Sequence, residues 1–244
     1  MNRILAALDV PTTREAVSMA DRIRPYVAGL KIGSQLFTAE GPSLVRELVD
    51  RGDRIFLDLK YHDIPNTVAE AVRSAALLGV WMVNVHASGG VKMMKAAWEA
   101  ADQAADTRGS RPLVIAVTVL TSFDEEGFRA IGVNRSIAAQ VEALAVMAQD
   151  AGLDGVVASP HEIAVIRARC GAQFQIVTPG IRTGAVSSDD DQARTMTAAD
   201  AVRAGATYVV VGRPILRAAD PGAAAADIAA AIASSELRTT SNER

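Results

Sequence analysis

The chain has 244 residues, half of them hydrophobic and only 4% aromatic, and its formal net charge at pH 7 is -3. This length suits one barrel or one doubly wound α/β domain, and the slight acidity argues against a protein that binds nucleic acid through a basic face. Cys170 is the only cysteine, which excludes an intrachain disulfide and a thiolate metal cluster. Because no secretory signal or membrane-spanning apolar run is visible either, we expect a cytoplasmic protein without membrane contact.

Short β-branched segments alternate with longer segments of helical periodicity along the whole chain. The pattern predicts eight strands, at Ile4–Asp9, Val27–Ile32, Arg54–Lys60, Trp81–His86, Leu113–Leu120, Asp154–Ser159, Phe174–Pro179 and Thr207–Gly212. Helices are expected between them, for example at Thr12–Ile23, Pro42–Asp50, Pro65–Leu78 and Ser136–Ala151. Glycines suited to a left-handed cap follow several helical runs, at Gly52, Gly79, Gly152, Gly171 and Gly205.

Strands that are separated by helices pair in parallel, with right-handed crossovers. Eight such units in 244 residues predict a single-domain α/β protein with the (β/α)8 TIM-barrel fold. A doubly wound open sheet is the alternative, but no glycine-rich fingerprint follows the first strand, where Asp9-Val-Pro-Thr12 stands instead. We therefore expect a barrel domain over residues 1–235, followed by a frayed polar tail over residues 236–244.

The segment FLDLKYHDIPNTV, residues 56–68, places Asp58 and Lys60 at the end of an apolar strand and Asp63 just beyond it. Side chains alternate faces along a strand, so Asp58 and Lys60 are expected to point the same way. Opposite charges on the buried face of a strand are costly unless they are paired, and they seldom persist for packing reasons. The cluster therefore predicts catalytic chemistry.

Lysine is rare in this chain, since only four of its 25 basic residues are lysine. Two of the four, Lys31 and Lys60, stand at predicted strand ends. Arginine keeps its proton near neutral pH, whereas lysine can release one. This usage favours a chemical role for Lys31 and Lys60, although a coincidence is the simpler alternative.

Polar groups end nearly every predicted strand, and active sites of this fold lie at the carboxyl ends of the strands. In chain order these groups are Asp9, Lys31, Asp58 with Lys60, His86, Thr118 to Thr121, Ser159, Thr178-Pro179 and Gly212-Arg213. The loops after strands seven and eight often hold a phosphate in such barrels. Here Gly212 would let a ligand approach the backbone and Arg213 could grip an anion, which predicts a phosphorylated substrate.

Taken together, these motifs resemble the orotidine 5′-phosphate decarboxylase family. The resemblance is carried by Asp58-Leu-Lys60-Tyr-His-Asp63-Ile-Pro-Asn-Thr67, Val177-Thr-Pro-Gly-Ile-Arg182, Val211-Gly-Arg213 and a downstream Gln192. It extends over most of the chain and includes Leu8-Asp9, Gly29-Leu-Lys31-Ile-Gly33 and Asn84-Val-His-Ala-Ser-Gly-Gly90. The aspartate–lysine–aspartate signature alone is shared with sugar-phosphate enzymes of the same barrel, whereas the combination is much more specific.

The resemblance implies decarboxylation of orotidine 5′-phosphate to uridine 5′-phosphate, the last step of de novo UMP synthesis, by a homodimer that uses no cofactor and no metal. It implies that Lys31, Asp58, Lys60 and the partner subunit's Asp63 form an alternating charge array and that Lys60 protonates the ring carbon. The implied substrate-binding residues are Asp9, Lys31, Thr67, Thr121, Pro179, Arg182, Gln192, Gly212 and Arg213.

Several residues and the function itself keep alternative interpretations at this stage. Asp63 could be a helix N-cap before Pro65 instead of a residue shared across a dimer, or it could serve both roles. His62 and His86 could be acid–base groups, but hydrogen bonding to a neighbour explains a strand-end histidine as well. The rival functions are a metal-dependent sugar-phosphate enzyme of the same barrel and a phosphate-binding barrel without catalysis.

Overall fold

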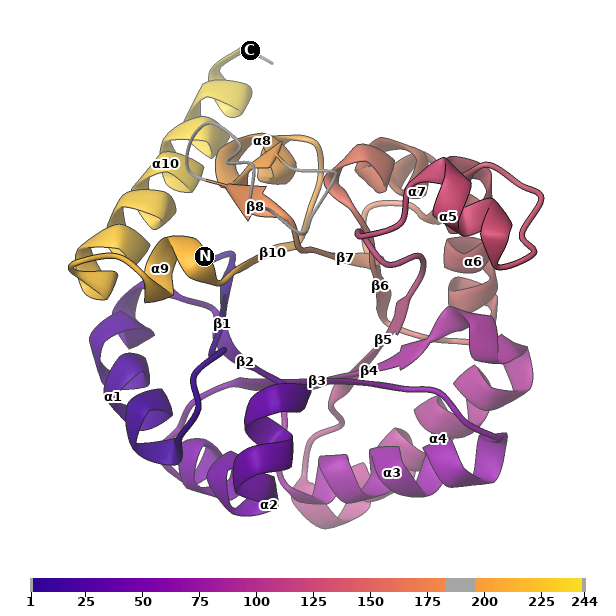
Figure 1. The fold of residues 1–244 in the computed structure, drawn as a ribbon, viewed down its shortest axis with the longest axis horizontal. Helices are drawn as coiled ribbons and strands as arrows, with labels where there is room; N and C mark the ends of the chain where they lie inside the picture. Colours follow the sequence, from indigo (N-terminus) through magenta and orange to yellow (C-terminus); the bar gives the residue numbers. More distant parts are fainter. Residues whose placement is uncertain (1, 183–195, 243–244) are drawn as a thin grey trace.

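The computed structural model describes residues 2–182 and 196–242, and these form a closed barrel of eight parallel strands surrounded by helices (Figure 1). The expected (β/α)8 fold is therefore confirmed. The barrel strands, in spatial order, are β1 (Ile4–Ala7), β10 (Tyr208–Val211), β7 (Gln175–Thr178), β6 (Gly155–Val157), β5 (Leu113–Val117), β4 (Met82–His86), β3 (Ile55–Tyr61) and β2 (Gly29–Gly33). A separate two-stranded sheet pairs β8 (Ile181–Arg182) with β9 (Met196–Thr197).

Helices follow the strands and cover the outside of the barrel. They are α1 (Thr13–Ile23), α2 (Ser34–Asp50), α3 (Pro65–Leu77), α4 (Gly90–Arg108), α5 (Glu125–Ala130), α6 (Ile137–Asp150), α7 (Ile163–Cys170), α8 (Ala198–Arg203), α9 (Arg213–Leu216) and α10 (Pro221–Asn242). Three short 3-10 turns lie at Arg24–Tyr26, Ala87–Gly89 and Pro160–Glu162.

The outward-facing and inward-facing side chains of the barrel strands form two separate apolar clusters. Outward-facing residues such as Val83 and Val85 pack with the helices, and both are fully buried. Inward-facing residues fill the barrel as a second cluster, made of Leu5, Phe56, Met82, Ile115, Val177 and Tyr208. The interior is therefore a packed apolar layer on which the residues nearer the carboxyl ends rest.

Local signals explain most helix boundaries. Thr12, Asp124 and Ser136 accept hydrogen bonds from backbone N–H groups of the first turns of α1, α5 and α6. The five predicted cap glycines all have positive φ, between 79° and 112°. The left-handed region is strained for a side chain with a Cβ, so the glycines end these helices as predicted.

Helix α2 begins earlier than expected. The sequence predicts a helix from Pro42, whereas α2 starts at Ser34 and kinks at Gly41, which has φ 69°. Proline suits the first turn of a helix, so the pattern marked the restart after the kink as the beginning.

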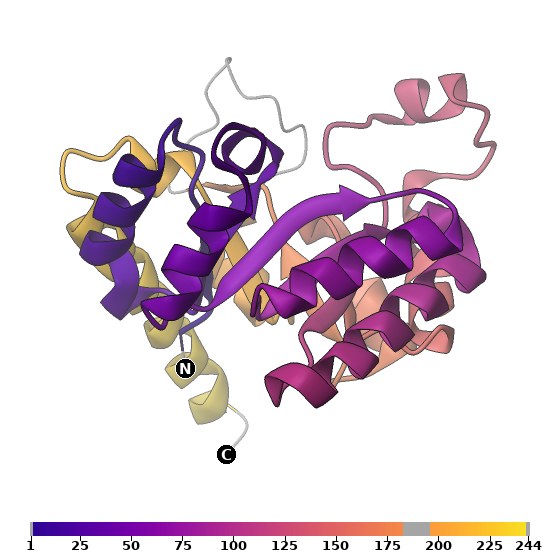
Figure 2. The same ribbon diagram turned by 90° about the horizontal axis from the view of Figure 1, so that it is seen from below.

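The C-terminal segment is the second departure. A frayed tail was expected from residue 236, but α10 remains helical to Asn242. Helix α10 packs against α1 and α8. Figure 2 shows both chain termini at one end of the barrel and α5 at the other.

Candidate active site

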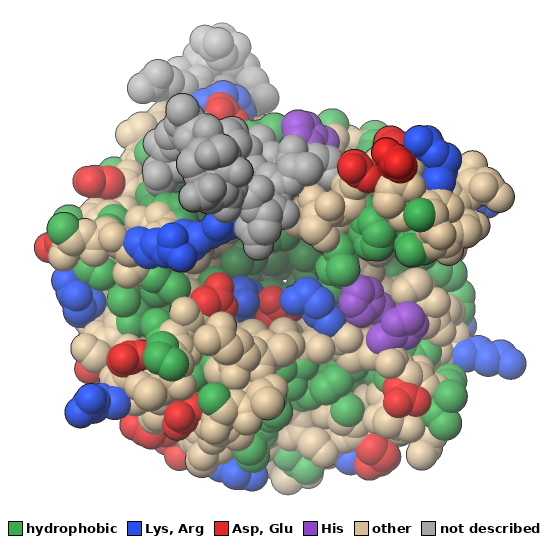
Figure 3. Space-filling view, viewed as in Figure 1, with side chains coloured by type: hydrophobic (Ala, Val, Ile, Leu, Met, Phe, Trp, Pro, Cys, Tyr) green, Lys and Arg blue, Asp and Glu red, His purple; other side chains and the backbone are tan. Residues whose placement is uncertain are grey.

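A cavity of about 680 Å³ opens at the carboxyl ends of the barrel strands. Acidic and basic side chains alternate across the hollow in this face of the molecule, with histidine beside them (Figure 3). Most of the predicted site residues line this cavity, namely Asp9, Lys31, Asp58, Lys60, Thr121, Pro179, Gly212 and Arg213. Residues that are far apart in sequence are thus brought together by the barrel topology.

Asp9, Lys31, Asp58 and Lys60 form a charged row along the cavity. At its centre, Asp58 contacts two ammonium groups. Its Oδ1 atom lies 2.7 Å from Lys60 Nζ, and its Oδ2 atom lies 3.3 Å from Lys31 Nζ. Lys31 Nζ is also 3.6 Å from Asp9 Oδ1. Asp58 and Lys31 are each 8% exposed, whereas 36% of the Lys60 side chain remains accessible. A buried carboxylate therefore binds two lysines that both line the cavity, and Lys60 is the more accessible of the two.

Strand β3 reaches this arrangement by an irregular route. Its register with β4 shifts between Leu57 and Tyr61, and Lys60 has φ 54°. Simple alternation, from which the shared direction of Asp58 and Lys60 was predicted, therefore does not hold at the end of the strand. A bulge turns the Lys60 backbone and still brings its ammonium onto Asp58.

A hydrogen-bonded amide on the neighbouring strand supports the bulge. Asn84 of β4 is fully buried, its Oδ1 atom accepts the Lys60 N–H at 2.8 Å, and its Nδ2 atom donates to Asp58 Oδ1 at 2.7 Å. Sequence reasoning missed this role, although a lone amide inside an apolar strand was an available signal.

The other side of the cavity offers open space beside a cation. A Cβ on Gly212 would make only ordinary contacts with Ala7 and Asp9, at 3.5 and 3.6 Å, so the protein's own packing does not require glycine here. The missing side chain instead keeps the backbone accessible next to Arg213. Gly180 also lines the cavity and needs its φ of 82°. This end is suited to an anion held by backbone and guanidinium groups.

Comparison with known proteins decides the family. The family model described as "Orotidine 5'-phosphate decarboxylase / HUMPS family" matches residues 2–228. The chain belongs to this family. The resemblance seen in the sequence is confirmed, and with it the expectation of an enzyme from a carboxy-lyase family.

Relatives and solved structures of the family match nearly the whole chain. Proteins named orotidine 5′-phosphate decarboxylase from Moorella thermoacetica and Alkalilimnicola ehrlichii are 52% and 54% identical, over 95% and 92% of this chain and 92% and 94% of theirs. The crystal structure of orotidine 5′-phosphate decarboxylase from Lactobacillus acidophilus is 35% identical, with a TM-score of 0.85 over 95% of this chain and 99% of that chain.

Two residues that the family resemblance places at the substrate lie outside this chain's own cavity lining. Asp63 and Thr67 are both exposed, the first just before α3 and the second in its first turn. Asp63 Oδ1 accepts the N–H of Ile64 at 2.6 Å, while the N-cap position of α3 is Ile64 and has no side-chain cap. The alternative interpretation of Asp63 as the helix N-cap is therefore wrong.

Two further residues of the expected phosphate site are only partly described. Arg182 lies in β8, where its backbone pairs with Thr197, and its side chain is outside the described part of the structure. Gln192 lies outside the described residues altogether. Their expected roles in phosphate binding therefore stay predictions.

The histidines next to the charged row form a pair. The rings of His62 and His86 are 5.4 Å apart at their centroids. Burial lowers the pKa of His86, and His62 and Lys60 lower it further, against an opposing effect of Asp58. These effects favour the neutral form of His86 near pH 7.

The described residues contain neither a cluster of metal-binding side chains nor a membrane-spanning helix. Within residues 2–182 and 196–242, no three His, Cys, Asp or Glu side chains gather in a way that could hold a metal ion. No helix in the described part of the chain has both the length and the apolar character needed to cross a membrane.

Proposed function

We propose that the protein converts orotidine 5′-phosphate to uridine 5′-phosphate without a cofactor, and that Lys60 protonates the ring carbon that loses the carboxylate. The observation that carries this proposal is the Lys60 ammonium held 2.7 Å from Asp58 at the wall of a closed-barrel cavity. The names of relatives that share about half of the sequence over nearly its full length favour this substrate over a sugar phosphate.

The chemistry explains why charge is needed. Breaking the bond between the ring carbon and the carboxylate releases carbon dioxide and leaves the electron pair on a vinyl-type carbon without an adjacent carbonyl sink. A cation placed where this charge develops stabilises the transition state. Lys60 then transfers one ammonium proton to the carbon and regains a proton from water. One group thus supplies both electrostatic stabilisation and the proton.

Asp58, which also binds Lys31, holds the Lys60 ammonium in position before the substrate binds. Asp58 binds both ammonium groups, so the Lys60 side chain does not have to reorganise during the reaction. Asp58 also lies where it could repel the substrate carboxylate, a contribution of ground-state destabilisation. Apolar residues including Phe56, Val117 and Val157 line the same cavity, and they help to keep water from the carbanion.

The phosphate group provides binding energy far from the reacting carbon. We assign it to Gly212 and Arg213, with Arg182 and Gln192 as further ligands, and we assign the ribose and pyrimidine to Asp9, Thr121 and Pro179. Energy gained at the phosphate can orient the ring against Lys60. Loss of these phosphate contacts should therefore lower turnover as well as affinity.

A homodimer would complete the array. Asp63 and Thr67 are exposed and absent from their own cavity lining, and the adjacent Ile64 is 66% exposed. The segment is thus accessible to a second chain, while its own cavity does not receive these side chains. We propose that this segment enters the cavity of a second copy, where Asp63 joins Lys31, Asp58 and Lys60 and Thr67 reaches the ribose.

We also propose that the enzyme works in the cytoplasm. Cys170 is buried and burial raises the pKa of its thiol, so this residue needs no oxidising compartment.

The central test is an absorbance assay with orotidine 5′-phosphate in the presence of a chelator. Wild type should turn over, and Lys60→Ala should be slower by about 10⁴-fold or more. Lys95→Ala is the matched control, because Lys95 is an exposed lysine on α4 and should retain full activity. Activity that disappears in chelator would contradict the cofactor-free mechanism, and no turnover of orotidine 5′-phosphate in either condition would favour the metal-dependent sugar-phosphate type of enzyme. Unchanged activity of Lys60→Ala would overturn the assigned role.

Shared sites can be tested by complementation. Mixed Lys60→Ala and Asp63→Ala chains should recover about one quarter of the wild-type activity, because half of the randomly formed dimers would carry one complete site each. Recovery should depend on subunit exchange. No recovery, or a monomer in sedimentation measurements, would contradict sharing of the sites.

A further inference from the structure

Lys60 has a backbone conformation that requires outside support. Among the described residues it is the only one other than glycine with positive φ. Such a conformation is strained for a residue with a Cβ and persists only where the surroundings hold it in place. Because the same residue carries the ammonium at the cavity, whatever holds its backbone also sets the direction of its side chain.

The described contacts identify Asn84 as the group that holds it. The backbone N–H of Lys60 can only donate, so the atom 2.8 Å away must be the amide oxygen of Asn84. The Asp58 carboxylate accepts in this network, so the atom 2.7 Å from its Oδ1 must be the amide nitrogen. The two neighbours therefore fix the orientation of the amide, and a side chain must both donate and accept to replace it.

Asn84 touches the charged row without touching the cavity. It is fully buried and is absent from the residues that line the cavity, whereas Asp58 and Lys60 both line it. Asp58 Oδ1 receives the amide N–H and the Lys60 ammonium together. One side chain thus ties the strained backbone of Lys60 to the carboxylate that binds its ammonium.

We propose that Asn84 is a positioning residue, which acts on the reaction by holding Lys60 in its left-handed conformation and Asp58 in its orientation toward both lysines. This inference rests on the proposed function, since it concerns the same charge array. Asn84 is expected to influence kcat with little effect on KM, because it contacts the reacting groups and not the substrate. A displacement of about 1 Å at a catalytic group can lower the rate about 10²-fold.

The sharpest test is Asn84→Asp, which conserves shape and the acceptor for Lys60 but replaces the donor to Asp58 with a second carboxylate. At pH 8 kcat should fall about 10²-fold or more, with KM within about threefold of the wild-type value. As the pH is lowered, one proton shared by the two carboxylates restores a donor. The ratio of mutant to wild-type kcat should therefore rise on acidification, an ionisation that wild type does not have. A purely structural role would not produce this pH profile.

Val83→Ala provides the matched control. Val83 lies on the same strand and is equally buried, but its side chain packs with the helices outside the barrel. This variant should lose stability and keep its kcat. Asn84→Ser is a second variant in case the first does not fold, and it should be intermediate in kcat because its hydroxyl can serve only one of the two neighbours at full strength.

The outcomes separate the two proposals. Wild-type turnover together with wild-type kcat in Asn84→Asp at pH 8 would overturn the inference alone. The inference would also fail if Val83→Ala lowered kcat as strongly as the Asn84 variants at the same loss of Tm. If wild type itself did not decarboxylate orotidine 5′-phosphate, the proposed function would fail and this inference with it.

Discussion

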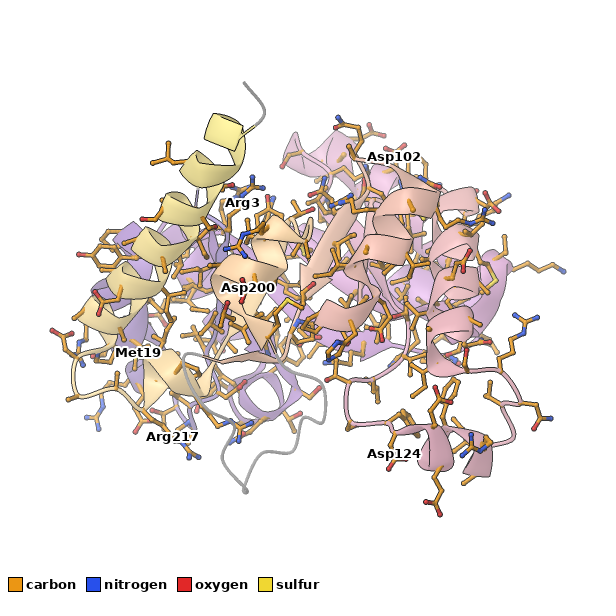
Figure 4. All side chains as sticks on the ribbon, turned by 90° about the horizontal axis from the view of Figure 1, so that it is seen from above. Arg3, Met19, Asp102, Asp124, Asp200 and Arg217 are labelled. Atoms are coloured by element: carbon orange, nitrogen blue, oxygen red, sulfur yellow. The ribbon has the colours of Figure 1, made fainter. Side chains whose placement is uncertain are left out.

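Both ends of the barrel contain ion pairs that are at least partly buried, but the carboxylate binds lysine at one end and arginine at the other. At the carboxyl end, Lys31 and Lys60 share Asp58 and border an open cavity. At the amino end, Arg111 binds Asp154 with two guanidinium contacts of 2.7 Å each, and Asp154 also accepts the Val114 N–H. Figure 4 shows the two ends, with Arg217 and Asp124 toward one and Arg3 and Asp102 toward the other.

At the amino end, arginine side chains donate several hydrogen bonds each to neighbouring oxygen atoms. Arg24 forms two bonds with Asp53, at 2.8 and 2.9 Å, and Arg167 donates to the carbonyl oxygens of Gly205 and Gly171 and to Thr207 Oγ1. A guanidinium that binds protein acceptors through several of its N–H groups stabilises the fold and has fewer donors left for a ligand. Lysine at the other end is a point charge with donors to spare. The comparison indicates that the amino end serves stability and the carboxyl end serves chemistry.

Exchanging the cation type at the carboxyl end should have the largest effect. Lys60→Arg retains the positive charge, but a guanidinium does not give up a proton near neutral pH and is too broad for the contact with Asp58. We expect turnover to fall about 10³-fold or more, with a change in unfolding free energy below about 1 kcal/mol. Steady-state kinetics and thermal unfolding check this together. Retained turnover would contradict the assignment of chemistry to the carboxyl end.

Removing an acid at the amino end should have the opposite signature. Asp154→Ala leaves the partly buried Arg111 and the Val114 N–H without their acceptor, so we expect a loss of about 3 kcal/mol of unfolding free energy. The kcat of the folded variant should be unchanged, because the pair lies across the barrel from the cavity. Denaturant unfolding measures the first quantity, and a large kcat defect in the folded fraction would contradict the assignment.

A conservative change of the second amino-end arginine should cost less. Arg167→Lys retains the charge but cannot span Gly205, Gly171 and Thr207 at once, so a loss of about 1–2 kcal/mol is expected. Burial lowers the pKa of Arg167, and lysine would be easier still to neutralise there. An unfolding midpoint identical to wild type would show that the fork geometry is unimportant.

The smallest expected effect is on the pH dependence of stability near the active site. Burial lowers the pKa of His86, so the unfolded chain binds a proton near pH 6.5 that the folded chain accepts only at lower pH. Folding stability should therefore be complete above pH 6.5 and decline as the pH falls below it. His86→Gln should flatten this decline, while the same substitution at the exposed His161 should not. Parallel pH profiles of Tm for His86→Gln and wild type would contradict this assignment.

Much of this arrangement could be predicted from local sequence signals. Eight apolar β-branched segments and their glycine-capped helices predicted the barrel, and polar strand ends predicted most of the cavity lining. The sequence marked Asn84 as a lone amide in an apolar strand, but its contact with Lys60 could not be located, because that contact depends on a register shift between two strands. The start of α2 at Ser34 was missed, because Pro42 after the kink has the features of a helix N-terminus. The location of Asp63 in an assembly depends on a second chain, and the family resemblance was the only signal for it in the sequence.

The most direct measurement is a paired one, of turnover and thermal stability, on Lys60→Gly. Glycine adopts the positive φ of this position without strain, and this gain offsets its larger loss of chain entropy on folding. We predict that decarboxylation of orotidine 5′-phosphate falls by about 10⁴-fold or more while the unfolding free energy stays within about 1 kcal/mol of wild type. A variant that remains active but unfolds several kcal/mol more easily would contradict the account, because Lys60 would then serve the fold and not the reaction.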